Sequence, residues 1–193
     1  MIQRLVDKII NKQVEEKTIA YEDRNVYRYG YILVCEVIIN IMIAVVIGVV
    51  FKDLAEILLF LGIYIPLRSY CGGWHADKIW KCTLLSNLIL LILIVIDEYV
   101  VENCPNAIMA AVFAVCLVFV FFVAPVETRS KPITEIERKD FKKKIYAILA
   151  LHVILILILM ITEQRKIMFI LTYVYMIQTL VLILGFADNK RVF

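Results

Sequence analysis

Residues 68–82 read RSYCGGWHADKIWKC and contain the side chains of this chain that are best suited to chemistry. Cys82 follows His75 by seven positions and comes directly after a lysine. A thiolate is the reactive form of cysteine, and nearby cations or a helix N-terminus stabilise it. A histidine within reach can accept the thiol proton. The stretch therefore suggests a Cys–His reaction centre, with Cys82 as the nucleophile and His75 as the base.

The spacing of these two residues constrains the local backbone. One straight helix would separate them by about 10 Å, whereas direct proton transfer needs a separation of about 3 Å. Gly72 and Gly73 give the chain conformational freedom just upstream. Asp77 is suited to cap a helix that begins after it. We therefore expect His75 on a turn and Cys82 in the opening turns of a helix.

Two other interpretations of the same residues remain open. Cys82 and His75 are also compatible with a buried thiol and an interfacial histidine that have no catalytic role. A metal site is the second alternative, because Cys71, His75, Cys82 and Asp77 are suitable ligands. The stretch matches no standard zinc spacing, however, and we predict neither a metal nor another cofactor.

The composition around this stretch is that of an integral membrane protein. The chain has 193 residues, of which 63% are hydrophobic, and its mean hydropathy is +0.87. Soluble domains are only about 45–50% apolar. We predict an all-α, polytopic membrane protein built as one domain (1–193), with no separate soluble domain and no nucleic-acid partner.

Six apolar segments predict six transmembrane helices. The first, fourth and sixth approach the roughly 20 residues needed to cross a bilayer, and the fifth is slightly shorter. The second and third have only 14 residues each. These two are either short re-entrant pieces or full spans extended by flanking polar residues. The segments are Tyr31–Val50, Leu54–Leu67, Thr83–Ile96, Ala107–Val126, Ile145–Ile161 and Ile167–Phe186.

The distribution of positive charge predicts the orientation. If all six segments cross, residues 1–30, 68–82, 127–144 and 187–193 share one side, and they carry 6, 3, 7 and 2 of the 21 Lys and Arg residues. The positive-inside rule assigns this richer side to the cytoplasm. We therefore predict a bacterial cell-membrane protein in which the bundle of residues 31–186 connects a cytoplasmic N-terminal segment to a cytoplasmic tail.

The N-terminal segment carries one apolar stripe among many charges. Its apolar side chains recur at helical spacing, which predicts an amphipathic, interfacial helix before the bundle. Such a helix either lies on the membrane surface or packs on the protein's own loops, and both arrangements remain open. The stripe consists of Ile2, Leu5, Val6, Ile9, Ile10 and Val14.

Polar residues within the apolar segments are candidates for function or for helix packing. Glu36 and Asn40 lie four residues apart and share one face of the first segment. A carboxyl group in lipid is costly and normally points into a bundle. There it would line a substrate groove or, as we favour, form an interhelical hydrogen bond. His152 is expected to be structural, and Asp97 is expected in an exposed outer loop.

The polar stretch resembles a motif of the accessory gene regulator B (AgrB) family. The resemblance rests on Arg68, the run Gly72-Gly73-x-His75-Ala76, Cys82, and a second stretch, APVETRSKPI (124–133), which is similar to the family's AP-x-E…KP segment. The length, the six spans and the charged N-terminus also match. The resemblance therefore covers essentially the whole chain.

This resemblance implies a membrane-embedded cysteine endopeptidase. Its substrate would be a short precursor of a quorum-sensing signal, with an amphipathic leader and an acidic C-terminal tail. The enzyme would remove the tail, retain the peptide as an acyl-thioester and support its cyclisation to a thiolactone or lactone. By position, Cys82 would be the nucleophile and His75 the base, while Arg68 and Gly73 match motif positions important for the site. The resemblance also implies a homodimer.

Charge and proximity predict further roles in such a site. Asp77 or Ser86 would orient His75, and cations on the predicted cytoplasmic side would attract an acidic peptide tail. The positive-inside bias alone also explains these cations, which are Arg68, Lys78, Lys81, Arg129 and Lys131. The alternative function is a transporter without proteolytic activity, in which Glu36, Asn40 and the glycines line a path.

Overall fold

The computed structural model describes residues 2–74, 79–127 and 134–190. Within these residues the chain is helical, with one isolated β-bridge between Gly72 and Val126 and no β-strand. The all-α prediction is confirmed. The elements are α1 (Ile2–Glu15), the 3-10 helix η1 (Tyr21–Asp23), α2 (Arg24–Phe51), α3 (Leu54–Cys71), α4 (Ile79–Asn103), α5 (Asn106–Val123), α6 (Glu135–Ile161) and α7 (Arg165–Lys190).

The helices from α2 to α7 are each long and apolar enough to cross a membrane, which confirms the six predicted spans. The second and third spans extend beyond their apolar segments. α3 has 18 residues and α4 has 25, because polar residues at their ends continue the helices. α3 therefore stays at the short end of the range of about 17–25 residues that spans a bilayer, whereas α4 is longer than expected from the sequence.

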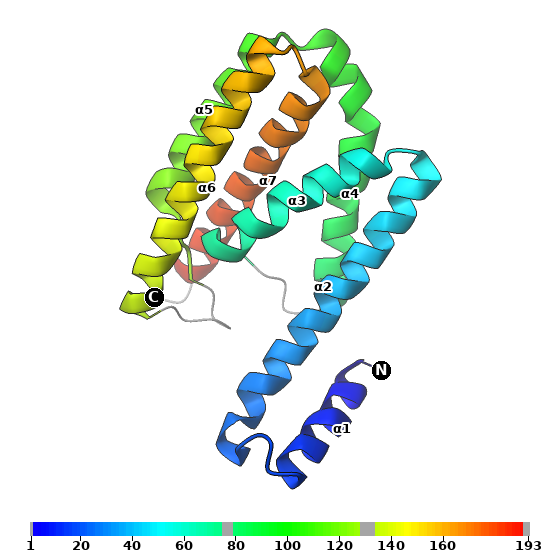
Figure 1. The fold of residues 1–193 in the computed structure, drawn as a ribbon, viewed down its shortest axis with the longest axis vertical. Coiled ribbons are helices and arrows are strands. Elements are labelled where there is room, and N and C mark those ends of the chain that lie inside the picture. The colour runs from blue at the N-terminus through cyan, green and yellow to red at the C-terminus, as the bar shows by residue number, and fades with distance from the viewer. Residues whose placement is uncertain (1, 75–78, 128–133, 191–193) are drawn as a thin grey trace.

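Figure 1 shows α5, α6 and α7 side by side, with α3 crossing obliquely between α7 and α2. The α4–α5 and α6–α7 turns lie at one end of the bundle. The last turn of α3 and the first turns of α4 and α6 lie at the other end, which we call the Cys82 end. This alternation is the one expected of six successive crossings. The assignment of the Cys82 end to the cytoplasm stays a prediction.

α7 is the central helix of the bundle. It contacts α3, α4, α5 and α6, so most of its circumference is covered by protein. This position explains why its sequence is apolar on nearly every side. Its deeply buried side chains include Met168, Leu171, Val174, Tyr175, Gln178 and Leu182.

A group of charged side chains joins the helices at the end opposite Cys82. Lys166, at the start of α7, lies 2.8 Å from Glu56, 3.4 Å from Asp97 and 3.8 Å from Asp53. Asp97 is 4% exposed and lies within α4, so the prediction of an exposed outer loop is wrong at this residue. Lys166 makes the burial of Asp97 possible, because an unpaired buried charge is costly.

α1 packs beside the first part of α2 (Figure 1). Val6 and Ile10 are buried, whereas Leu5 and Ile9 are about half exposed. A 2.6 Å contact between Arg28 and Asp7 reinforces this packing. Part of the apolar stripe thus packs on the chain itself, although on a helix rather than on loops. The remaining part is free to contact the membrane surface, which stays a prediction.

Two local features fix α6 in the bundle. Thr134 and Glu137 form a reciprocal capping box at its N-terminus, and such a box satisfies backbone N–H groups that the helix leaves unpaired. Further along, His152 is buried with its Nδ1 atom 3.0 Å from the hydroxyl of Tyr175. This environment agrees with the structural role expected of His152.

Candidate functional site around Cys82

Cys82 is the fourth residue of α4, as the sequence predicted for a residue in the opening turns of a helix. Its side chain is partly buried. Three helices contribute to its surroundings: Glu36 of α2 and Ser86 of α4 lie beside the thiol, and Arg68 of α3 lies within electrostatic reach. A carboxyl, a hydroxyl and a guanidinium therefore surround one sulfur atom at the end of a membrane-spanning bundle.

Arg68 holds the backbone that follows α3. Its guanidinium donates hydrogen bonds to the carbonyl oxygens of Gly72 and Trp74. The side chain is therefore turned toward the chain itself, which differs from the surface role expected from its charge. Arginine suits this task because its planar group can donate in two directions at once.

The two glycines of the stretch are fixed rather than free. Gly72 and Gly73 have φ angles of +67° and +109°, a region that residues with a side chain rarely adopt. The Gly73 N–H donates to Val126 O at 3.2 Å, and the Val126 N–H donates to Cys71 O at 2.9 Å. The sequence predicted that these glycines let the chain bend, and their positive φ angles agree with this; the bend is held by defined partners.

α7 supports the same turn from the other side. The Trp74 N–H donates to Val181 O at 3.0 Å, and Gln178 Nε2 donates to Gly72 O at 3.3 Å. Gly185 permits this approach, since a Cβ atom there would lie 2.6 Å from Trp74 N. Gly185 was not among the site residues predicted from the sequence. The only signal available was a single glycine near the end of the last apolar segment.

Several predicted site residues lie outside the part of the chain that the structure describes. These are His75, Asp77, Lys78, Arg129 and Lys131. Their roles, and a metal site that would include His75 and Asp77, therefore stay untested. Among the described residues, no three His, Cys, Asp or Glu side chains gather in a group that could hold a metal ion.

The remaining predicted site residues lie in the part of the chain that the structure describes. Ser86 lies beside the Cys82 thiol, and its predicted role in orienting His75 stays a prediction. Lys81 is exposed, with its Nζ atom 5.8 Å from the centre of the Trp80 ring. Glu36 lies beside Cys82 of the neighbouring helix α4, while the interhelical hydrogen bond favoured for it stays a prediction.

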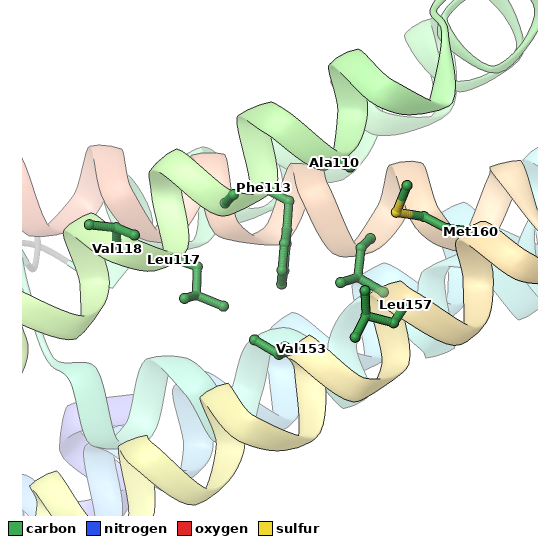
Figure 2. A pocket seen from close by; sticks show the side chains of 9 residues that line it. Ala110, Phe113, Leu117, Val118, Val153, Leu157 and Met160 are labelled. Carbon is green, nitrogen blue, oxygen red and sulfur yellow. The ribbon is translucent and has the colours of Figure 1, made fainter.

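A hollow of about 240 Å³ lies between α5 and α6. Neither of these helices carries Cys82, Glu36 or Arg68. Figure 2 shows its labelled side chains, all apolar, facing the space between the two helices. They include Phe113 and Leu117 of α5 and Val153 and Leu157 of α6. The hollow offers no acid, base or nucleophile, so the chemistry is to be sought around Cys82.

Comparison with known proteins gives the chain a family. The family model described as Accessory gene regulator B matches residues 2–182. The chain belongs to the AgrB family. Membership supports a role in the agr quorum-sensing system, whose AgrB proteins are processing enzymes acting on a precursor peptide. Together with the six apolar helices, it also supports a multi-pass membrane protein.

Individual relatives agree with this membership. AgrB-like protein 2 of Clostridium perfringens strain 13 is 30% identical over 158 residues, which cover 79% of this chain and 74% of that protein. An AgrB-like protein of Listeria monocytogenes serotype 4a is 40% identical over 84 residues, or 42% of this chain and 39% of that one. No solved structure matches the chain.

Proposed function

We propose that the chain is a membrane-embedded cysteine endopeptidase. It cleaves the acidic C-terminal tail from a quorum-sensing precursor peptide and keeps the remaining peptide as an acyl-thioester on Cys82. The observation that carries the proposal is the position of this thiol. Cys82 lies in the first turns of α4, among polar groups from α2, α3 and α4, at the end of an otherwise apolar bundle.

In the proposed first step, His75 accepts the thiol proton while Cys82 Sγ attacks the scissile carbonyl carbon. The C–N bond breaks, and the proton passes to the amine of the departing tail. An internal thiol or hydroxyl of the peptide then attacks the thioester and closes a thiolactone or lactone ring. A site at the edge of the bilayer limits the access of water, which would hydrolyse the thioester.

Each of the other motif residues has a task in this proposal. Arg68 acts as a positioning residue, because it fixes the carbonyl of Trp74 directly before His75. Gly72 and Gly73 allow the backbone turn that Arg68 holds. Four cations draw the acidic tail to this end of the bundle, namely Lys78, Lys81, Arg129 and Lys131. Asp77 is the candidate to orient His75.

The proposed setting follows from the same assignments. The termini and the loop with Cys82 face the bacterial cytoplasm, where the precursor is made. The amphipathic leader of the precursor lies on the bilayer beside the exposed apolar residues of α1, such as Leu5 and Ile9. The enzyme works as a homodimer.

Co-expression with a precursor peptide tests the proposal. Mass spectrometry of the purified protein should find the tail-less peptide attached to Cys82, and the free tail should accumulate. Cys82→Ala should abolish both products and His75→Ala should reduce both strongly, whereas Cys71→Ala, a matched cysteine control, should keep them. If the Cys82→Ala variant still releases the tail, the chain is not a protease that acts through this thiol, and transport becomes the better account.

A further inference from the structure

Glu36 is an ionisable residue inside a membrane-spanning helix, and the proposed tail cleavage does not use it. Its carboxyl group lies beside the Cys82 thiol, where α2 packs against α4. The Oε1 atom is buried with no hydrogen-bond partner among the described residues, and no ion pair involves Glu36 in that part of the chain. A carboxyl group is expensive in such a place and usually serves a function.

Arg68 makes this carboxyl group suitable for proton exchange with Cys82. The guanidinium lies within electrostatic reach of the thiol, so the local group includes one cation, one carboxyl and one thiol, with the Tyr64 phenol also within reach of Arg68 and Cys82. When a proton moves between Glu36 and Cys82 Sγ, the negative charge moves across one contact and the net charge of the group stays the same. No additional charge is buried, which removes the main cost of proton transfer in an apolar environment.

We propose that Glu36 is the acid–base residue of the ring-closing step. This inference rests on the proposed function. The Glu36 carboxylate accepts the proton of the attacking thiol or hydroxyl of the peptide while the bond from that atom to the thioester carbonyl carbon forms. The bond between this carbon and Cys82 Sγ then breaks. Glu36 gives the same proton to Sγ, which restores the carboxylate and the thiol.

The geometry favours ring closure over tail removal for this residue. In tail removal the proton must finally reach the amine nitrogen of the departing peptide. In ring closure it must reach Sγ itself, which is the atom that Glu36 contacts. A group already beside the leaving atom needs no movement to protonate it. Glu36 therefore serves the second step, and His75 serves the first.

Glu36→Gln tests the assignment, because glutamine keeps the size of the side chain and cannot transfer the proton. The variant is co-expressed with the precursor, and three species are measured by mass spectrometry: the released tail, the peptide adduct on Cys82 and the cyclic peptide. We expect tail release and adduct to persist, with some linear peptide from hydrolysis. The cyclic peptide should fall by about 10²-fold or more, as for the loss of a general acid–base group.

Two further variants calibrate this measurement. Glu36→Asp keeps the acid and should restore part of the cyclic product. Glu98→Gln removes an exposed carboxyl from α4, the helix that carries Cys82, and should leave all three species unchanged. Detergent melting curves of each variant establish that the fold is retained.

Two results would overturn the assignment. One is a Glu36→Gln variant that yields cyclic peptide at the wild-type rate. The other is a folded Glu36→Gln variant that forms neither adduct nor tail, because Glu36 would then act before ring closure. Failure of the proposed function looks different, since Cys82→Ala would then still release the tail.

Discussion

Gly185→Ala tests most directly whether α7 supports the backbone turn that precedes His75. Gly185 lies in α7, and the backbone of residues 73 and 74 passes directly over it. A methyl group there would lie 2.6 Å from Trp74 N and 2.9 Å from the carbonyl carbon of Gly73. Ordinary van der Waals contacts between such atoms are about 3.5–4.0 Å. The turn must therefore move by roughly 1 Å away from α7.

The expected effect on stability is a moderate loss, because one gain opposes two costs. Alanine favours a helix over glycine by about 1 kcal/mol. Forcing an extra methyl group into a packed contact costs about 1–3 kcal/mol, and weakening the bond from Trp74 N–H to Val181 O costs about 0.5–1.5 kcal/mol. We expect a net loss of about 0.5–3.5 kcal/mol in the free energy of unfolding.

The effect on activity should be larger, because a misplacement of about 1 Å in a catalytic arrangement can cost about 10²-fold in rate. Tail release from the precursor is measured by mass spectrometry, and thermal unfolding in detergent is measured in parallel. Gly30→Ala and Gly62→Ala are matched controls, since a Cβ atom at either helical glycine meets nothing within 4 Å. Both should be as active as the wild type. Equal tail release by Gly185→Ala and Gly30→Ala would show that contact with α7 does not position the reactive turn.

Other substitutions examine separate contacts. Arg68→Lys keeps the charge but loses the planar group that donates to two carbonyls. Tail release should therefore fall at least tenfold, which is as far as in Arg68→Gln. Full activity of the lysine variant would indicate a purely electrostatic role. Lys166→Met should lower the free energy of unfolding by about 1–3 kcal/mol, because it leaves the buried carboxylate of Asp97 unpaired. Tail release per folded molecule should stay normal. An unchanged melting temperature would contradict a stabilising role of Lys166. The hydrogen bond from Arg28 lowers the pKa of Asp7, so the attachment of α1 should be complete above the ordinary pKa of about 3.8 and weaken as the pH falls below it. Protease cleavage between α1 and α2 reports this change, and Asp7→Asn should cleave at neutral pH as the wild type does in acid.

The helices could be predicted from the sequence because their apolar character is a local property. Each span shows its own hydropathy, and the bilayer fixes its minimum length. Helix ends were less predictable, since α4 continues through Asp97 to Asn103. The sequence placed Asp97 in an exposed loop because its partner Lys166 lies 69 positions away in the chain. A buried ion pair is a tertiary property, and no window of neighbouring residues reveals it.

The site was predictable in its residue types and not in its contacts. The position of Cys82 in the first turn of α4 followed from the expected helix start. The contact of Glu36 with Cys82 did not follow, because it depends on how α2 packs against α4. The backbone contacts of Arg68 were equally unpredictable, since its charge alone does not reveal that its guanidinium holds the carbonyls of Gly72 and Trp74.

The described parts of the two stretches that carry the family resemblance are joined to each other, although more than 40 positions separate the stretches in the chain. Val126 of the second stretch exchanges backbone hydrogen bonds with Cys71 and Gly73 of the first. These bonds use the N–H and the carbonyl of Val126 and not its side chain. Val126 therefore fixes one edge of the turn through its backbone, while α7 fixes the other through Val181. The residue that directly precedes His75 thus has a fixed backbone, and a catalytic group is positioned reproducibly only when its supporting backbone is rigid.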